Sequence, residues 1–163
     1  MQKSKPMAKQ YNKASQNNSE AYQKLTDIDG TVPPQSIELE QAVLGALMLE
    51  KDAIIEVQEY IRPETFYTEE HRTIFRVIQE LSQEMKAIDL YTVSERLKAH
   101  KQLTKVGGAA YLAQLTQRVA SAAHIEFHSK IIAQKFVQRE LIRAATEIQR
   151  RSYDEEIDVT ELI

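Results

Sequence analysis

The chain has 163 residues, a formal net charge of −3 and no cysteine or tryptophan. This length suits one domain with a real core, while the missing cysteines exclude a disulfide scaffold or a thiolate metal site. No apolar stretch approaches the roughly 20 residues of a membrane span, and the weak, mixed charge is not typical of a nucleic-acid-binding surface. From the missing cysteines we expect an intracellular, cytoplasmic protein. Because glycine and proline are few and helix-forming residues are abundant, we expect an all-α fold.

The first ordered element is predicted to begin after a polar tail. Residues 1–33 carry few large apolar side chains, and we expect them to be disordered. Pro33 and Pro34 favour an extended run-in, and Ser36 is placed to cap a helix that runs to about Glu50. Apolar residues recur along that helix at helical spacing, which predicts that it packs one wide face on a core.

Three more helices are predicted to complete a compact head over residues 34–105. Asp52 can cap a second helix, and a third begins near Thr68, with two glutamates in its first turn. Residues 92–95 read Thr-Val-Ser-Glu, the pattern of a capping box, so we expect a fourth helix to begin at Thr92.

The character of the sequence changes after Gly107 and Gly108. A short amphipathic helix, a small-residue break over 119–122 and a long uninterrupted helical pattern follow, which predicts a projecting antiparallel hairpin over residues 106–153. The long helix has more apolar positions than one partner helix would cover, and we expect the surplus to contact another chain. Those positions are Phe127, Ile131, Ile132, Phe136, Val137, Leu141, Ile142, Ala145 and Ile148.

Motifs that would carry chemistry are weak in this sequence. His124 and His128 are four residues apart, but Glu126 does not directly follow the first histidine as the zinc-protease HExxH motif requires. The four glycines lack the spacing of a phosphate-binding loop, and the basic residues of the long helix alternate with glutamates. We therefore predict no catalytic, cofactor-binding or metal-binding residue here. The rival hypotheses are a metal-dependent enzyme using the two histidines and direct DNA binding by the hairpin.

Five blocks of sequence, taken together, resemble the N-terminal domain of the bacterial replicative DNA helicases of the DnaB family. The resemblance extends from Val32 to about Ile163. The blocks are PPQSIELEQAVLG at 33–45, FYTEEHRTIF at 66–75, IDLYTVSERL at 88–97, VGGAAYLAQL at 106–115 and ASAAHIEFHSKII at 120–132.

The resemblance implies an assembly domain whose motor lies elsewhere. In the family a linker, here starting over residues 154–163, leads to a RecA-like motor that uses ATP and Mg²⁺ in a hexameric helicase that unwinds duplex DNA at the replication fork. The N-terminal domains pair and form a collar, a trimer of dimers, that docks the primase, and a helicase loader is a further expected partner. DNA would be handled only weakly or indirectly by this domain.

The family's motif positions place partner contacts at Glu38, Tyr111, Ile142 and Ile148. The two isoleucines are at helical spacing and could equally belong to the core of the hairpin. The main alternative is a stand-alone helical adaptor, such as a loader or a primase-binding protein without a motor. The reading frame beyond Ile163 distinguishes these hypotheses, because the helicase requires a linker and a P-loop there.

Overall fold

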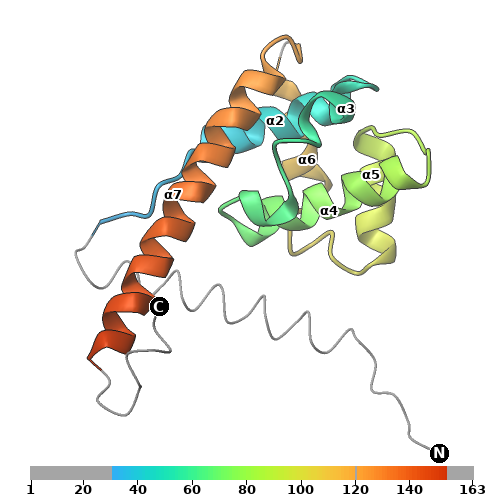
Figure 1. Ribbon diagram of the computed structural model, residues 1–163. Coiled ribbons are helices and arrows are strands. Elements are labelled where there is room, and N and C mark those ends of the chain that lie inside the picture. The colour runs from blue at the N-terminus through green and yellow to red at the C-terminus, as the bar shows by residue number, and fades with distance from the viewer. Residues whose placement is uncertain (1–30, 120, 154–163) are drawn as a thin grey trace, which may run out of the picture. The chain divides into compact units, whose positions relative to one another are not determined.

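The computed structural model describes residues 31–119 and 121–153, all of whose regular elements are helices (Figure 1). These elements are α2 (Ile37–Leu49), α3 (Ala53–Val57), the short 3₁₀ helix η1 (Pro63–Thr65), α4 (Glu69–Gln83), α5 (Leu90–Ala99), α6 (Gly108–Gln117) and α7 (Ile125–Ser152). The all-α prediction is thereby confirmed for the described residues. The predicted linker and all but the last three residues of the predicted tail lie outside them. None of the described helices has the length and apolar character needed to cross a membrane.

Two compact units divide the chain, and the division falls within α7, between Gln138 and Arg139. The larger unit comprises residues 35–138 and holds the hydrophobic core. From here on we call this unit the head, although it extends beyond the range 34–105 expected from the sequence. In the described part of the other unit, the buried Arg139 side chain donates a hydrogen bond of 2.8 Å to the carbonyl of Pro34. Arg139 therefore ties the run-in before α2 to the second half of α7.

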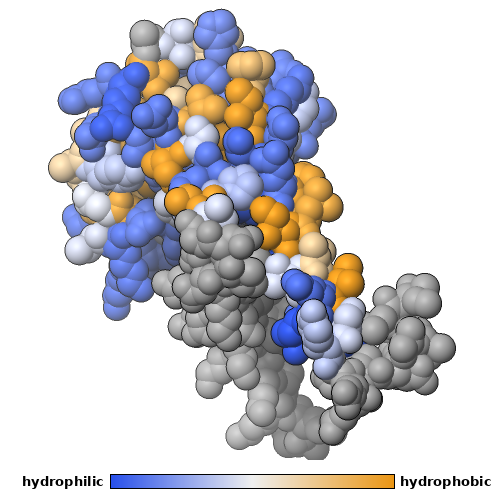
Figure 2. Space-filling view, turned by 90° about the vertical axis from the view of Figure 1, so that its left-hand side faces the viewer, coloured by the Kyte–Doolittle hydropathy of each residue, from blue (hydrophilic) through white to orange (hydrophobic). Residues whose placement is uncertain are grey.

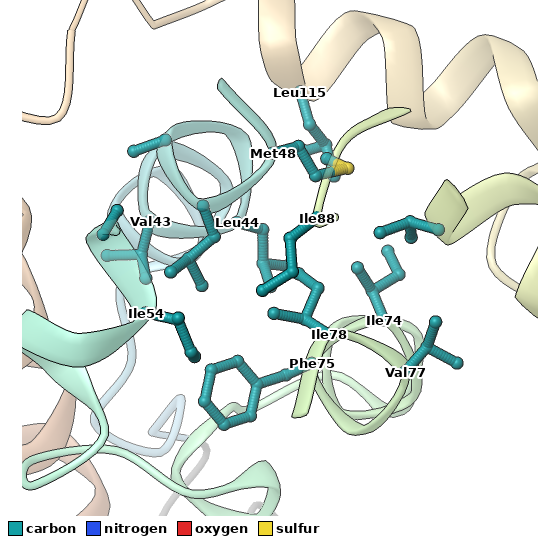
Figure 3. Packing of buried hydrophobic residues seen from close by; sticks show 14 of the residues in the cluster. Val43, Leu44, Met48, Ile54, Ile74, Phe75, Val77, Ile78, Ile88 and Leu115 are labelled. Atoms are coloured by element: carbon teal, nitrogen blue, oxygen red, sulfur yellow. The ribbon is translucent and has the colours of Figure 1, made fainter. Parts of the chain in front are cut away.

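The core of the head is built around α2, which packs against α3, α4, α5 and α6. Figure 3 shows side chains from α2, α4 and α6 pointing toward a common apolar centre. The second half of α2 is buried on every side, from Val43 to Met48, which differs from the single packed face that the sequence predicts. On α4, Ile74, Ile78 and Leu81 are buried at helical spacing. Among the fully buried side chains are Leu44, Ile74, Phe75, Ile78 and Leu115.

Helix starts were predicted correctly at α4 and wrongly at α5. Thr68 caps α4, and its hydroxyl accepts a hydrogen bond from the amide of His71. On α5, Asp89 is the capping residue, and it exchanges hydrogen bonds of 2.8 and 3.0 Å with Thr92. Thr92 is thus the third residue of the helix, and the predicted box with Glu95 is wrong. Asp89 is itself a preferred capping residue and stands three positions earlier.

Replacing Asp89 with alanine is expected to lower the free energy of unfolding by about 1 kcal/mol, the usual effect of removing a capping side chain. Glu95→Ala is the matched control, because Glu95 is an exposed residue of the same helix, and it should change stability by less than about 0.5 kcal/mol. Urea denaturation followed by circular dichroism measures both. An equal loss from the two variants would contradict the observed start of α5.

A surface cluster of charges joins the end of α4 to α5. The Arg96 guanidinium contacts Glu84 at 2.6 Å and Glu80 at 3.3 Å, and Lys86 contacts Glu84 at 2.6 Å. The hydrogen bond from Arg96 and, to a smaller extent, the one from Lys86 lower the pKa of Glu84 to about 2. The cluster therefore favours the ionised form of the Glu84 carboxylate in the folded protein.

This lowered pKa predicts an acid-dependent part of the stability. A group whose pKa is lower in the folded state stabilises the fold above its unfolded pKa, near 4.5, and loses that contribution as the pH falls toward about 2. Between pH 4.5 and 2, Arg96→Gln should therefore lose less stability than the wild type. Thermal melts across this range measure the slopes. Lys98→Gln, on the same helix, serves as the control and should keep the wild-type slope.

Helix α6 packs within the head, against α2 and α5. Its Leu112 and Leu115 are fully buried, and α2 approaches it closely at Gly45. A Cβ atom built on Gly45 would lie 2.2 Å from the carbonyl oxygen of Leu115, so only glycine fits this crossing. The projecting hairpin of residues 106–153 stays a prediction, whereas the packing of its first helix on α2 follows from these contacts.

Helix α7 has 28 residues and matches the long helix predicted from the sequence. In the head, Ile125 and Ile132 join the core. Toward its C-terminus the helix is mostly exposed, and i, i+3 ion pairs such as Arg143–Glu140 and Arg150–Glu147 support it.

Candidate partner-binding site

Tyr111, one of the four predicted contact residues, is a half-buried side chain on α6 whose hydroxyl turns into the head. The hydroxyl lies 2.7 Å from Nε2 of His71 on α4, and it accepts a hydrogen bond of 3.2 Å from Nε2 of Gln41 on α2. Three helices thus meet at this oxygen. The polar tip of Tyr111 is therefore engaged within the head.

Behind Tyr111 lies a buried pair of ionisable side chains. Nδ1 of His71 is 2.6 Å from Oε2 of Glu40, and both residues are about 1% exposed. The other carboxylate oxygen, Oε1, accepts the backbone amide of Tyr67 at 2.7 Å. Glu40 is fully engaged within the head, as a buried carboxylate must be to offset its desolvation.

The outer end of this polar chain reaches the surface at the C-terminal end of α6. There the exposed guanidinium of Arg118 donates a hydrogen bond to Oε1 of Gln41. We call the residues Glu40, His71, Tyr111, Gln41 and Arg118 the polar chain. It runs from the interior of the head to solvent and links α2, α4 and α6.

The ring of Tyr111 is confined from another side by Gly107, the residue before α6. Gly107 has a left-handed backbone, with φ of 101°. A Cβ atom added there would lie 2.8 Å from Cβ and 3.0 Å from Cγ of Tyr111. Gly107 therefore supplies both the backbone conformation that begins α6 and the space that the tyrosine ring occupies.

Glu38 lies on the exposed side of α2, three residues before Gln41. Residues three apart on a helix share a face, so Glu38 belongs to the same surface as the outer part of the polar chain. The structure therefore brings two predicted contact residues, Glu38 and Tyr111, onto neighbouring helices of the head. Ile142 and Ile148 belong to the other unit, and they are exposed at 42% and 62%.

An apolar stripe on α7 is also exposed. Phe127, Leu141 and Ile148 fall at multiples of seven residues and are 64%, 65% and 62% exposed. Val137 and Ala144 lie between them at the intermediate helical spacing and are exposed too. This 3-4 spacing is that of a coiled-coil seam, and Figure 2 shows apolar side chains reaching the surface. We call these five residues the α7 stripe.

The start of α7 is held by polar contacts of Glu126. Glu126 accepts hydrogen bonds from Lys130 at 2.6 Å and Tyr60 at 3.0 Å, and these two contacts lower its pKa. The rings of His124 and His128 are 6.2 Å apart. In the described part of the chain, no group of three or more potential ligands could hold a metal ion.

The buried pair of Glu40 and His71 was missed by the sequence analysis. Glu40 stands in the first turn of α2, where the helix dipole alone accounts for an acidic residue. A signal for His71 existed, because it stands three, four and seven residues before Ile74, Phe75 and Ile78, which line the buried face of α4. A histidine in such a register is expected to face the core and to need polar partners there.

Comparison with known proteins identifies the family of this fold. The family model described as the DnaB-like helicase N terminal domain matches residues 32–134. The replicative DNA helicase DnaB of Rhodothermus marinus is 46% identical over 134 residues, which cover 82% of this chain and 14% of that protein. Its counterpart from Geobacillus stearothermophilus is 42% identical over 130 residues, which cover 78% of this chain and 29% of the relative.

Solved structures agree with this assignment. The N-terminal domain of the DnaB helicase from Mycobacterium tuberculosis superposes with a TM-score of 0.77 at 36% identity, covering 80% of this chain and 92% of that one. A structure of a DnaB-like replicative helicase and its interactions with primase gives a TM-score of 0.64 at 28% identity. The match covers 71% of this chain and 27% of the chain in that structure. The chain thus spans less than a third of the two curated relatives that it matches. It belongs to the family of DnaB-like helicase N-terminal domains.

Proposed function

We propose that this chain is the N-terminal assembly and primase-docking part of a cytoplasmic replicative DNA helicase. Its family and the names of its relatives support this function over that of a stand-alone adaptor. In the complete protein, a motor domain uses ATP and Mg²⁺ to unwind duplex DNA, and this domain acts on DNA indirectly, by shaping the collar.

The single observation that carries the assembly role is the exposed α7 stripe. A row of large apolar side chains with coiled-coil spacing is unfavourable in water. A second copy of the same helix offers an apolar surface of the same kind, and a twofold pair of copies is the commonest form of assembly. Pairs built in this way would then form the collar, a trimer of dimers.

Sedimentation of this chain at several concentrations tests the pairing. Ile148→Glu is expected to shift the species toward the monomer, because a charge would enter the apolar contact. Ile55→Glu is the matched control, since Ile55 is equally exposed, at 61%, but lies on α3 of the head. If both variants sediment like the wild-type chain and that chain is oligomeric, the α7 stripe is not the contact.

The primase contact is proposed at Glu38, Tyr111, Ile142 and Ile148, and a helicase loader is a second partner of the same domain. A structural relative was solved with its interactions with primase, which supports primase as the partner. The exposure of Glu38, Ile142 and Ile148 leaves their side chains available. Of the four, Tyr111 offers the largest rigid side chain, the kind that dominates the energetics of interfaces.

Binding of purified bacterial primase tests this contact. Tyr111→Ala combined with Ile142→Ala should weaken binding at least about tenfold, since each removes an apolar contact side chain. The control is Tyr91→Ala combined with Ile55→Ala, which truncates the same two residue types at exposed positions of 74% and 61% elsewhere in the head. Circular dichroism must show unchanged helicity. Equal affinity of the two double variants would contradict the proposed contact.

A further inference from the structure

We infer that His71 is a positioning residue, held with its single ring proton on Nδ1, that fixes Tyr111 so that a partner meets the tyrosine ring and not its hydroxyl. The inference rests on the proposed primase contact for its functional part. Its chemical part, the position of the proton on His71, stands on the contacts of the polar chain alone. The two parts can therefore be tested separately.

The direction of each hydrogen bond in the polar chain follows from its outer end. An arginine can only donate, so Oε1 of Gln41 accepts from Arg118, and the amide nitrogen of Gln41 donates to the oxygen of Tyr111. Tyr111 then has one hydrogen of its own to place. His71 Nε2, at 2.7 Å, receives it only if that nitrogen carries no proton.

The inner end of the chain leads to the same assignment. With Nε2 accepting, the proton of a neutral imidazole stands on Nδ1 and is donated to Oε2 of Glu40 at 2.6 Å. Glu40 then accepts two hydrogen bonds, one per oxygen, as an ionised carboxylate can. If Nε2 carried a proton, Tyr111 would accept from both Gln41 and His71, and its own hydrogen would lack an acceptor among these contacts.

This arrangement restrains Tyr111 in both of its side-chain torsions. The hydroxyl is held by His71 and Gln41, and the bare Cα of Gly107 admits the base of the ring. The planes of the His71 and Tyr111 rings are 4° apart, so the two rings lie almost parallel along their shared hydrogen bond. A rigid aromatic side chain loses little conformational entropy when a partner binds it.

The proton on His71 is tested by nuclear magnetic resonance of the whole 163-residue chain with ¹⁵N-labelled histidine. The His71 signals are assigned by their loss in His71→Asn. We expect the ¹⁵N shift of a protonated nitrogen at Nδ1 and of an unprotonated nitrogen at Nε2. In Tyr111→Phe, which removes the donor to Nε2, the shift of Nε2 should change. A proton on Nε2 of the wild-type chain would overturn the assignment.

The positioning role is tested by primase affinity in His71→Asn, whose shorter side chain can still reach Glu40 but not Tyr111. We expect the affinity to fall roughly tenfold, the effect of losing about one well-placed contact. Signals of ¹³C-labelled Tyr111 should show faster ring motion in this variant. A rigid Tyr111 ring and wild-type affinity in folded His71→Asn would overturn the inference.

Gly107→Ala and its neighbour Gly108→Ala form a second, matched test. Both glycines have positive φ, of 101° and 77°, so alanine strains the backbone in each. Only at position 107 would the new methyl group meet Tyr111, whereas at 108 nothing lies within 4 Å. Gly107→Ala should therefore weaken primase binding several-fold more than Gly108→Ala. Equal primase affinities of the two glycine variants would contradict the positioning role. If the wild-type chain itself binds no primase, the proposed contact is refuted, whereas the proton assignment on His71 stands.

Discussion

Replacing Gly45 with alanine is expected to lower the free energy of unfolding by about 2 kcal/mol, in the range of forced overpacking in a closed core. The new methyl carbon would lie 2.2 Å from the Leu115 carbonyl oxygen and 2.9 Å from Cγ2 of Val119. The carbonyl is backbone, so α2 and α6 must move apart. Alanine also gains about 1 kcal/mol of helix propensity over glycine, which the clash must exceed.

Urea denaturation of the wild type and of Gly45→Ala measures this loss. Adding Val119→Ala to the variant removes the side-chain contact but not the carbonyl, so it should restore little of the lost stability. Full rescue would show that the side chain alone limits the space. A variant as stable as the wild type would mean that separating the two helices costs no more than the gain in helix propensity, about 1 kcal/mol.

Replacing Glu40 with alanine is expected to lower the free energy of unfolding by about 3 kcal/mol, because it leaves two buried hydrogen-bond donors without an acceptor, and each such loss costs about 1–3 kcal/mol. The substitution removes the acceptor for His71 Nδ1 at 2.6 Å and for the Tyr67 amide at 2.7 Å. Both groups lie in an interior where an unmade hydrogen bond is costly. The polar chain should then lose its inner end.

Glu38→Ala is the matched control, since Glu38 and Glu40 both stand in the first turn of α2. Glu38 is exposed, so its removal should lower the free energy of unfolding by no more than about 0.5 kcal/mol, the usual value of a carboxylate near a helix N-terminus. Chemical denaturation compares the two variants directly. Similar losses would indicate that the buried pair contributes no more than the helix dipole does.

Much of the fold could be predicted from local patterns of sequence. The end of α2, the cap of α4 at Thr68 and the length of α7 follow from apolar spacing and from capping residues, which act within a few positions of one another. The error at α5 arose because two overlapping pairs of residues each fit a local capping pattern. One pair is Asp89 with Thr92, and the other is Thr92 with Glu95. Asp89 is the capping residue in the structure, and aspartate is more strongly preferred than threonine at that position.

The polar chain could not be predicted in the same way, because its members come from three helices. Gln41 and Tyr111 are 70 positions apart, and Glu40 and His71 are 31 apart. No periodicity within one helix reveals such a contact, and only tertiary packing brings the groups together. For the same reason, the contacts of the Tyr111 hydroxyl with His71 and Gln41 could not be predicted, and the partner contact at Tyr111 stays a prediction.

The close crossing of α2 and α6 also constrains the order in which the head folds. Gly45 meets Leu115, so the first helix of the core finds its main neighbour only after most of the head has been synthesised. Contacts so distant in sequence slow folding, because a long loop must close before they form. During synthesis on the ribosome, α2 can therefore pack on α3, α4 and α5 first, while its surface around Gly45 stays uncovered until α6 emerges.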